Sequence, residues 1–94
     1  MKPYDRLREK VLERDCWSCL DCGCFTAEIH HILSRRYGKV AWEERNMLSL
    51  CHECHLYKDG GAHRTIKRKE HLELLAKLHG YEYDEPRFQE VLNA

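Results

Sequence analysis

Two pairs of cysteines carry the strongest chemical signal in the sequence. Each pair has two residues between its members, and 28 residues separate Cys19 and Cys22 from Cys51 and Cys54. Four thiolates complete the tetrahedral coordination of zinc, and such a site is structural because no position remains for water. Zinc binding of this kind is worth on the order of 10 kcal/mol, comparable with the stability of a whole small domain. The spacing therefore predicts a structural zinc ion on which folding depends.

Two further cysteines leave a second register open. Cys16 precedes Cys19 by the same spacing that separates Cys19 from Cys22. We favour Cys19 with Cys22, because Gly23 follows that pair directly and glycine suits the tight turn around a metal. In this register Cys16 and Cys24 are small, partly buried residues without a metal-binding role.

The segment that contains the second pair also matches a different signature. Residues 51–55 are CHECH, and C-x-x-C-H is the pattern of covalent haem attachment. Such attachment is typical of exported proteins, whereas this chain has no charged start followed by an apolar run. Haem would also leave Cys19 and Cys22 without a role, so we rank haem below zinc.

Length and composition suit a small domain in a reducing compartment. A chain of 94 residues buries a modest core, and chains of this size often need a metal or disulfides for stability. Since no export signal is seen, we expect a cytoplasmic protein whose six cysteines stay reduced. No segment is long and apolar enough to span a bilayer, so no membrane contact is expected.

Three histidines and an asparagine stand beside the cysteine pairs. His30 and His31 are adjacent, Asn46 precedes the second pair, and His55 follows Cys54 directly. Neighbours on a strand point to opposite faces, so at most one of the adjacent histidines faces a given site unless the backbone bends. Neutral imidazole has a pKa near 6.5, so it suits both metal binding and proton removal near neutral pH.

These residues together resemble the HNH endonuclease family. The resemblance is carried by CLDCG at 19–23, HHI at 30–32 and RNMLSLCHECH at 45–55, and it covers roughly residues 10–60. It implies an α+β fold, a small zinc-stabilised domain. The expected core is of the ββα-metal (His-Me finger) type, flanked by an N-terminal helix and C-terminal helices.

The resemblance also implies a role for each matching residue. His30 and His55 would bind one catalytic divalent metal, His31 would be the general base, and Asn46 would hold His31 in its orientation. A third metal ligand would be Asp59, with His63 as a substitute. Because both first ligands are nitrogens, we name Mn²⁺ first, with Mg²⁺, Ni²⁺ or cobalt as alternatives.

The activity implied is hydrolysis of DNA phosphodiester bonds. One such site cuts one strand, so a monomer would nick with low sequence specificity, and a double-strand break would need two sites, as in a weak homodimer. Arg35 and Arg36 follow the predicted base and could contact a phosphate, or they are solvated loop residues. A noncatalytic zinc module that binds nucleic acid or protein is the alternative function.

The charge distribution gives weaker support. The formal net charge is zero, yet residues 31–69 carry nine Lys and Arg against four Asp and Glu, whereas residues 78–94 carry one against four. A basic middle favours contact with phosphates, although charged runs are more often solvated surfaces.

The elements that must position these residues follow from hydrophobic periodicity. One domain, 1–94, is expected, with a core at about 16–60 and a helical extension at about 62–94. The predicted helices cover 3–14, 52–58, 64–78 and 85–92; strands cover 27–33 and the segment around Met47, Leu48 and Leu50; residues 34–45 form an exposed loop. The longest helix should bury a stripe of Ile66, Leu72, Leu75 and Leu78. Its basic residues are either phosphate contacts or a solvated face; they are Arg64, Lys67, Arg68 and Lys69.

Overall fold

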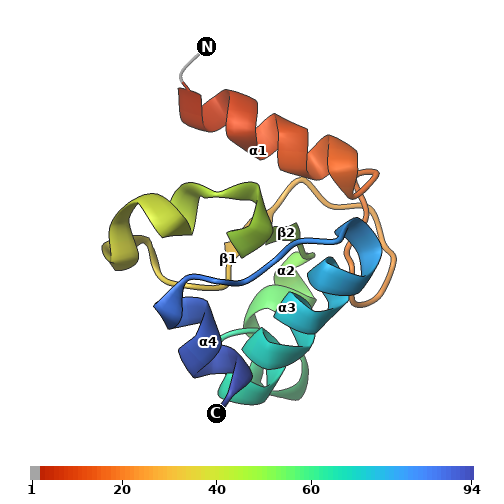
Figure 1. Cartoon of the computed structure of the whole chain (residues 1–94). Coiled ribbons are helices and arrows are strands. Elements are labelled where there is room, and N and C mark those ends of the chain that lie inside the picture. The colour runs from red at the N-terminus through yellow and green to blue at the C-terminus, as the bar shows by residue number, and fades with distance from the viewer. Residues whose placement is uncertain (1–2) are drawn as a thin grey trace.

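Helices surround a short two-stranded sheet in the computed structural model, which describes residues 3–94. In chain order the elements are α1 (Pro3–Arg14), β1 (Ile29–His31), the 3-10 helices η1 (Arg35–Trp42) and η2 (Glu44–Asn46), β2 (Met47–Ser49), α2 (His52–Leu56), the 3-10 helix η3 (Lys58–Gly60), α3 (Thr65–His79) and α4 (Pro86–Leu92). Helix α1 lies on one side of the sheet, and α3 and α4 lie on the other (Figure 1). The molecule is thus a small domain of mixed helices and sheet.

Strands β1 and β2 pair antiparallel and bring both adjacent histidines to the centre of the molecule. His30 lies opposite Leu48 and His31 opposite Met47. Helix α2 begins three residues after β2 ends, and Cys51 caps its N-terminus by accepting from the Cys54 amide. The sheet and α2 therefore place the adjacent histidines His30 and His31 beside the C-x-x-C-H segment at residues 51–55.

The core lies between the sheet and the C-terminal helices. Its buried members include Leu48 and Leu50 from the hairpin, Leu72 and Leu75 from α3, and Phe88 from α4. Helix α3 ends where Gly80 adopts a left-handed conformation, with φ of 71°.

The stripe predicted for α3 is half wrong. Leu72 and Leu75 are fully buried, whereas Ile66 and Leu78 remain 59% and 53% exposed. His71 is buried beside Leu72 instead. At 3.6 residues per turn, Ile66 falls on the side of the helix opposite this buried face, and the buried face includes a polar residue that periodicity does not select.

The exposed loop predicted for residues 34–45 is also wrong. The segment forms η1 and most of η2, and Val40 and Ala41 are buried. The Ser34 hydroxyl accepts from the Arg36 amide at the start of η1. The charged residues of this segment suggested a loop, but the free energy gained by burying Val40 and Ala41 favours the folded 3-10 helix.

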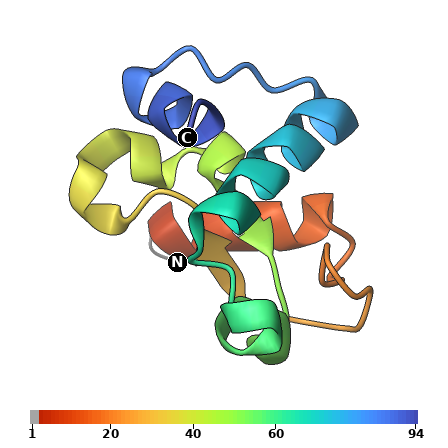
Figure 2. The same cartoon turned by 90° about the horizontal axis from the view of Figure 1, so that it is seen from below.

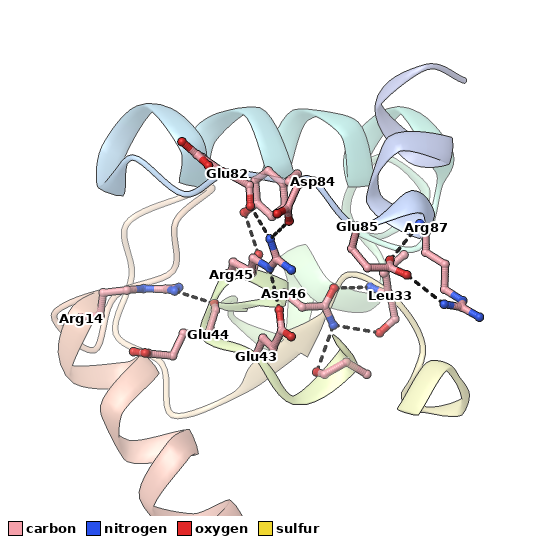
Figure 3. A network of polar contacts seen from close by, with 12 residues as sticks. Arg14, Leu33, Glu43, Glu44, Arg45, Asn46, Glu82, Asp84, Glu85 and Arg87 are labelled. Carbon is pink, nitrogen blue, oxygen red and sulfur yellow. Dashed lines mark hydrogen bonds and ion pairs between the residues drawn. The ribbon is translucent and has the colours of Figure 1, made fainter. Parts of the chain in front are cut away.

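Arg45 fastens the C-terminal segment to the hairpin. Its guanidinium contacts Asp84 at 2.8 Å and the Glu82 carbonyl, and it lies 5.0 Å from the centre of the Phe88 ring. The Tyr83 hydroxyl donates in return to the Arg45 carbonyl at 2.7 Å. Figure 3 shows this network beside Asn46, which points in a different direction, toward Leu33.

Within residues 3–94, no helix has the length and apolar character needed to cross a membrane.

Candidate metal centres

The four cysteines of the two C-x-x-C pairs converge in space. Their sulfur atoms all lie within 4.8 Å of one another, and the Sγ atoms of Cys22 and Cys51 are 3.6 Å apart. Tetrahedral zinc with bonds of about 2.3 Å requires sulfurs separated by roughly 3.8 Å. The cluster could therefore hold a structural metal ion, in the register Cys19, Cys22, Cys51 and Cys54, and its donor set suits zinc.

Backbone amides support this cluster in both pairs. The Cys22 amide faces the Cys19 sulfur, and the Cys54 amide faces the Cys51 sulfur, each at 3.5 Å. Gly23 closes the first turn with φ of 82°. Burial and the neighbouring thiols raise the pKa of the Cys54 thiol, so the deprotonated cluster needs a cation to neutralise it.

The two remaining cysteines lie outside this set of four. Cys16 and Cys24 are both exposed, rather than partly buried as expected. The Cys24 sulfur nevertheless lies 3.3 Å from that of Cys22.

A second cluster consists of three histidines. His30 from β1, His55 from α2 and His63 each place a ring nitrogen within 4.8 Å of the other two. His30 is 1% exposed, and neither of its ring nitrogens has a hydrogen-bond partner among residues 3–94. Burial and the adjacent His55 and His63 lower the pKa of His30 to about 2. A neutral imidazole with unpartnered nitrogens in a buried site is the arrangement that a bound metal would satisfy.

Glu28 orients one of these histidines. Its carboxylate accepts from Nδ1 of His55 at 2.9 Å and contacts His52 at 3.3 Å. Although burial opposes the change, these hydrogen bonds lower the pKa of Glu28. Since Nδ1 carries the proton, Nε2 of His55 is left free to bind a metal. The sequence analysis missed Glu28, yet it lies two residues before His30, a spacing that puts both on one side of an extended chain.

The structure brings His63 into the cluster and leaves Asp59 outside it. Asp59 is exposed and lines a separate pocket with Asp21, Lys58 and Lys67. The chain reverses at the end of η3, at Gly60 and Gly61, whose φ values are 88° and 85°. The reversal returns the chain to His55, whose carbonyl accepts from the amide of Ala62, the residue before His63.

His31 has one ring nitrogen bound and one free. Its Nδ1 lies 2.8 Å from the Ala41 carbonyl oxygen. Because a carbonyl can only accept, Nδ1 carries the proton and Nε2 has a lone pair, which is buried and has no partner within residues 3–94. Burial lowers the pKa of His31; the nearby charge of Arg35 acts in the same direction, and the bond to Ala41 opposes both.

Asn46 holds the carbonyl to which His31 donates. Its side-chain amide donates to the carbonyls of Ala41 and Leu33 at 3.0 and 3.1 Å, and its oxygen accepts from the Leu33 amide at 2.7 Å. Figure 3 shows Asn46 reaching Leu33 across the loop. Asn46 thus acts on His31 through Ala41.

One groove of about 630 Å³ joins these groups. It is lined by His30, His31, His55 and His63 and by the polar residues Ser34, Arg35, Arg36 and Arg68. Both adjacent histidines border it, although neighbours on a straight strand would face apart. Arg35 and Arg36 are exposed at its rim, and Arg36 donates to the Tyr37 hydroxyl at 3.2 Å. A groove with arginines on its walls suits a negatively charged substrate.

His71 and Asp21 tie the cysteine cluster to α3. Nε2 of His71 lies 3.0 and 3.1 Å from the two carboxylate oxygens of Asp21, which stands between Cys19 and Cys22. The hydrogen bond lowers the pKa of Asp21. The sequence analysis assigned neither residue, since an aspartate inside a C-x-x-C pair has no partner nearby in the chain.

Comparisons with known proteins identify no relative: no protein-family model, no curated protein and no solved structure matches the chain. What the chain does is therefore inferred from its own side chains.

Proposed function

We propose that the chain is a metal-dependent DNA endonuclease of the HNH kind, which hydrolyses phosphodiester bonds and nicks one strand. One observation supports this most: His31, whose Nε2 has no hydrogen-bond partner within residues 3–94, lines the same groove as the three-histidine cluster. A positioned base beside a candidate metal site is the combination that phosphodiester hydrolysis requires.

His31 acts as the general base. Its Nε2 removes a proton from water, the water oxygen bonds to phosphorus, and the bond from phosphorus to the 3′ oxygen breaks. A 5′ phosphate remains, and the 3′ oxygen takes a proton from solvent. The hydrogen bond from Nδ1 to the Ala41 carbonyl fixes the tautomer and favours the imidazolium that forms. Asn46 keeps that carbonyl in place.

His30, His55 and His63 would hold the catalytic cation. Bound there, a divalent cation would neutralise the charge that develops on the scissile phosphate and on the departing 3′ oxygen. Relative to Mg²⁺, three imidazoles favour Mn²⁺, Ni²⁺ or cobalt, and this preference is stronger than it would be with Asp59 as the third ligand. We keep Mn²⁺ as the first choice.

The proposed nuclease core is a ββα-metal unit made of β1, β2 and α2. It is flanked by α1 on one side and by α3 and α4 on the other (Figures 1 and 2). The paired strands carry His30 and His31, and α2 carries His55. Zinc at the four cysteines would hold the start of α2 against the segment before β1.

DNA is the proposed partner, bound through its phosphates. Arg35 and Arg36 at the groove rim can contact them, and contacts of this kind position DNA without reading its sequence. We therefore expect low specificity, and nicking by a monomer or a weak homodimer.

The first prediction concerns His31. Purified protein with Mn²⁺ should convert supercoiled plasmid to open circles, and His31→Ala should lower the rate by roughly 10²-fold or more, because the general base is lost. Zinc content and the circular dichroism spectrum should not change, since His31 lies outside the cysteine cluster.

His79→Ala is the matched control, because His79 is exposed at the end of α3. Chelation that removes Mn²⁺ but leaves zinc content unchanged should stop nicking by the parent chain. Undiminished nicking by His31→Ala would refute the assignment of the base. DNA binding without cleavage in any divalent cation would favour the noncatalytic zinc module.

A further inference from the structure

Arg68 differs from the other arginines that line or brace the structure. Its Nε atom is buried and has no hydrogen-bond partner among residues 3–94. Arg14, Arg45 and Arg87, by contrast, all pair with carboxylates. A buried guanidinium nitrogen without an acceptor is costly, so it points to an acceptor that the chain itself does not supply.

The side chain lies where two grooves meet. Arg68 lines the groove of the histidines, and it also lines a second groove of about 220 Å³ between η1 and α4, together with Tyr37, Arg87 and Glu90. Figure 2 shows η1 and α4 next to each other beside α3. A polymer strand that runs from the histidine groove into the groove between η1 and α4 must pass Arg68.

Two arginines line the same groove as the histidines. Arg68 from α3 and Arg35 from η1 both border the groove that His31 and His63 line. The proposed base and the proposed metal site therefore share their groove with two cations.

The start of α3 adds to this positive field. The first turn of the helix has no acidic residue, and the N-cap residue Arg64 makes no side-chain capping bond. Free amides at a helix N-terminus favour a nearby anion.

We infer that Arg68 binds a backbone phosphate of the DNA strand at the junction of the two grooves, next to the three histidines. The inference rests on the proposed function. A guanidinium can donate two parallel hydrogen bonds to phosphate oxygens, which holds the strand in register as well as attracting it.

The test compares DNA binding by Arg68→Met, Arg68→Lys and the control Lys77→Met, each in the His31→Ala background with Mn²⁺ present. Lys77 is exposed on the last turns of the same helix. Arg68→Met should weaken binding roughly tenfold or more, and the slope of log affinity against log salt should fall by about one. Arg68→Lys should keep the slope and lose part of the affinity. Lys77→Met should match its parent.

Cleavage and metal binding complete the test, with His31 intact. Arg68→Met should raise KM for plasmid, should not weaken Mn²⁺ binding, and should leave the midpoint of thermal unfolding equal to or above that of the parent, because the unpartnered buried Nε is removed. Parental affinity and salt slope in Arg68→Met would overturn the inference alone, as would weaker binding with an unchanged slope. A parent chain that neither binds nor cleaves DNA would overturn the proposed function and the inference with it.

Discussion

Asn46 uses its buried side chain to fix the backbone around His31. The amide group donates to two carbonyls and the oxygen accepts from one amide, so all three bonds need the donors and the acceptor of a neutral asparagine. No contact between Asn46 and the ring of His31 is involved. The residue is therefore a positioning residue, and its effect on activity should exceed its effect on metal binding.

Asn46→Asp should be destabilising although the two side chains have nearly the same shape. The carboxylate keeps the acceptor but loses both donors. The Leu33 carbonyl and the new carboxylate oxygen are then left without a donor in a buried place, and the Ala41 carbonyl keeps only His31. Each unsatisfied group costs about 1–3 kcal/mol, so the free energy of unfolding in urea should fall by about 3 kcal/mol or more.

Nicking by the folded fraction of Asn46→Asp should also fall, because the Ala41 carbonyl to which His31 donates is no longer held in place. Asn93→Asp, at the exposed end of α4, is the control and should leave both quantities unchanged. Parental stability in Asn46→Asp would contradict the hydrogen-bond scheme.

At the scale of elements, the turn after α2 determines where the third histidine lies. Helix α2 ends at Leu56, and a left-handed conformation at three consecutive residues, Asp59 to Gly61, reverses the chain. A Cβ atom on Gly61 would lie 2.8 Å from the Leu56 carbonyl oxygen. Only glycine fits this position without moving the backbone that carries His63.

Gly61→Ala should therefore disturb the histidine cluster and spare the cysteine cluster. We expect Mn²⁺ binding by calorimetry, and nicking with it, to weaken while zinc content stays at one ion per chain. The appropriate control is Gly80→Ala, since Gly80 also has positive φ but has open space where Cβ would lie. That control should cost about 1 kcal/mol of stability and leave Mn²⁺ binding intact. Equal Mn²⁺ affinity in both variants would show that the turn does not position His63.

Most elements could be predicted because their signals are local. Periodicity and end signals gave helices at 3–14, 64–78 and 85–92, close to α1, α3 and α4. The two wrong predictions concern residues whose environment is tertiary: Val40 and Ala41 of η1 are buried, and the buried face of α3 includes His71, which pairs with Asp21. Neither environment is visible in the neighbouring residues.

The residues of the candidate site divide in the same way, into those with a signal in the sequence and those whose roles depend on the tertiary structure. The four cysteines could be selected by their spacing, and His30 and His55 by the resemblance to the HNH family; the structure brings them into two clusters. Glu28 was missed, although its spacing from His30 places both on one side of an extended chain. Arg68 was named together with Arg64, Lys67 and Lys69, and nothing in the sequence separates it from them, because the burial of its Nε depends on where α3 lies in space. Asp59 and His63 were both named as third ligands, and only the conformation of two glycines separates them.

At the scale of the whole molecule, the cysteine cluster connects segments that have little regular structure of their own. Residues 15–28 contain no helix or strand longer than a single bridge, yet they are tied to β2 by the Leu20 amide on the Ser49 carbonyl and by the Asp15 carboxylate on the Ser49 amide. Asp21 ties them to α3. A metal at the cluster would therefore stabilise the hairpin, α2 and α3 together.

Removal of zinc should unfold the chain as a unit. Cys51→Ser, or chelation of the parent, should abolish the helical circular dichroism signal, because a contribution on the order of 10 kcal/mol exceeds what a domain of this size can lose. Added zinc should restore the chelated parent. Cys16→Ser should keep zinc and fold, since Cys16 lies outside the cluster. A helical, cooperatively melting Cys51→Ser protein would contradict a structural role for the metal.

Arg45 and Asn46 are consecutive, and they face different partners. Residues 82–88 grip Arg45 through its guanidinium and its carbonyl, and the next peptide unit carries the side chain that braces the loop around His31. A fragment that stops after α2, or after α3, would thus lack residues 82–88 and with them the contacts that hold Arg45. It would release the backbone that carries His31, the proposed base, so we expect the shortest version of this chain that nicks DNA to reach at least α4.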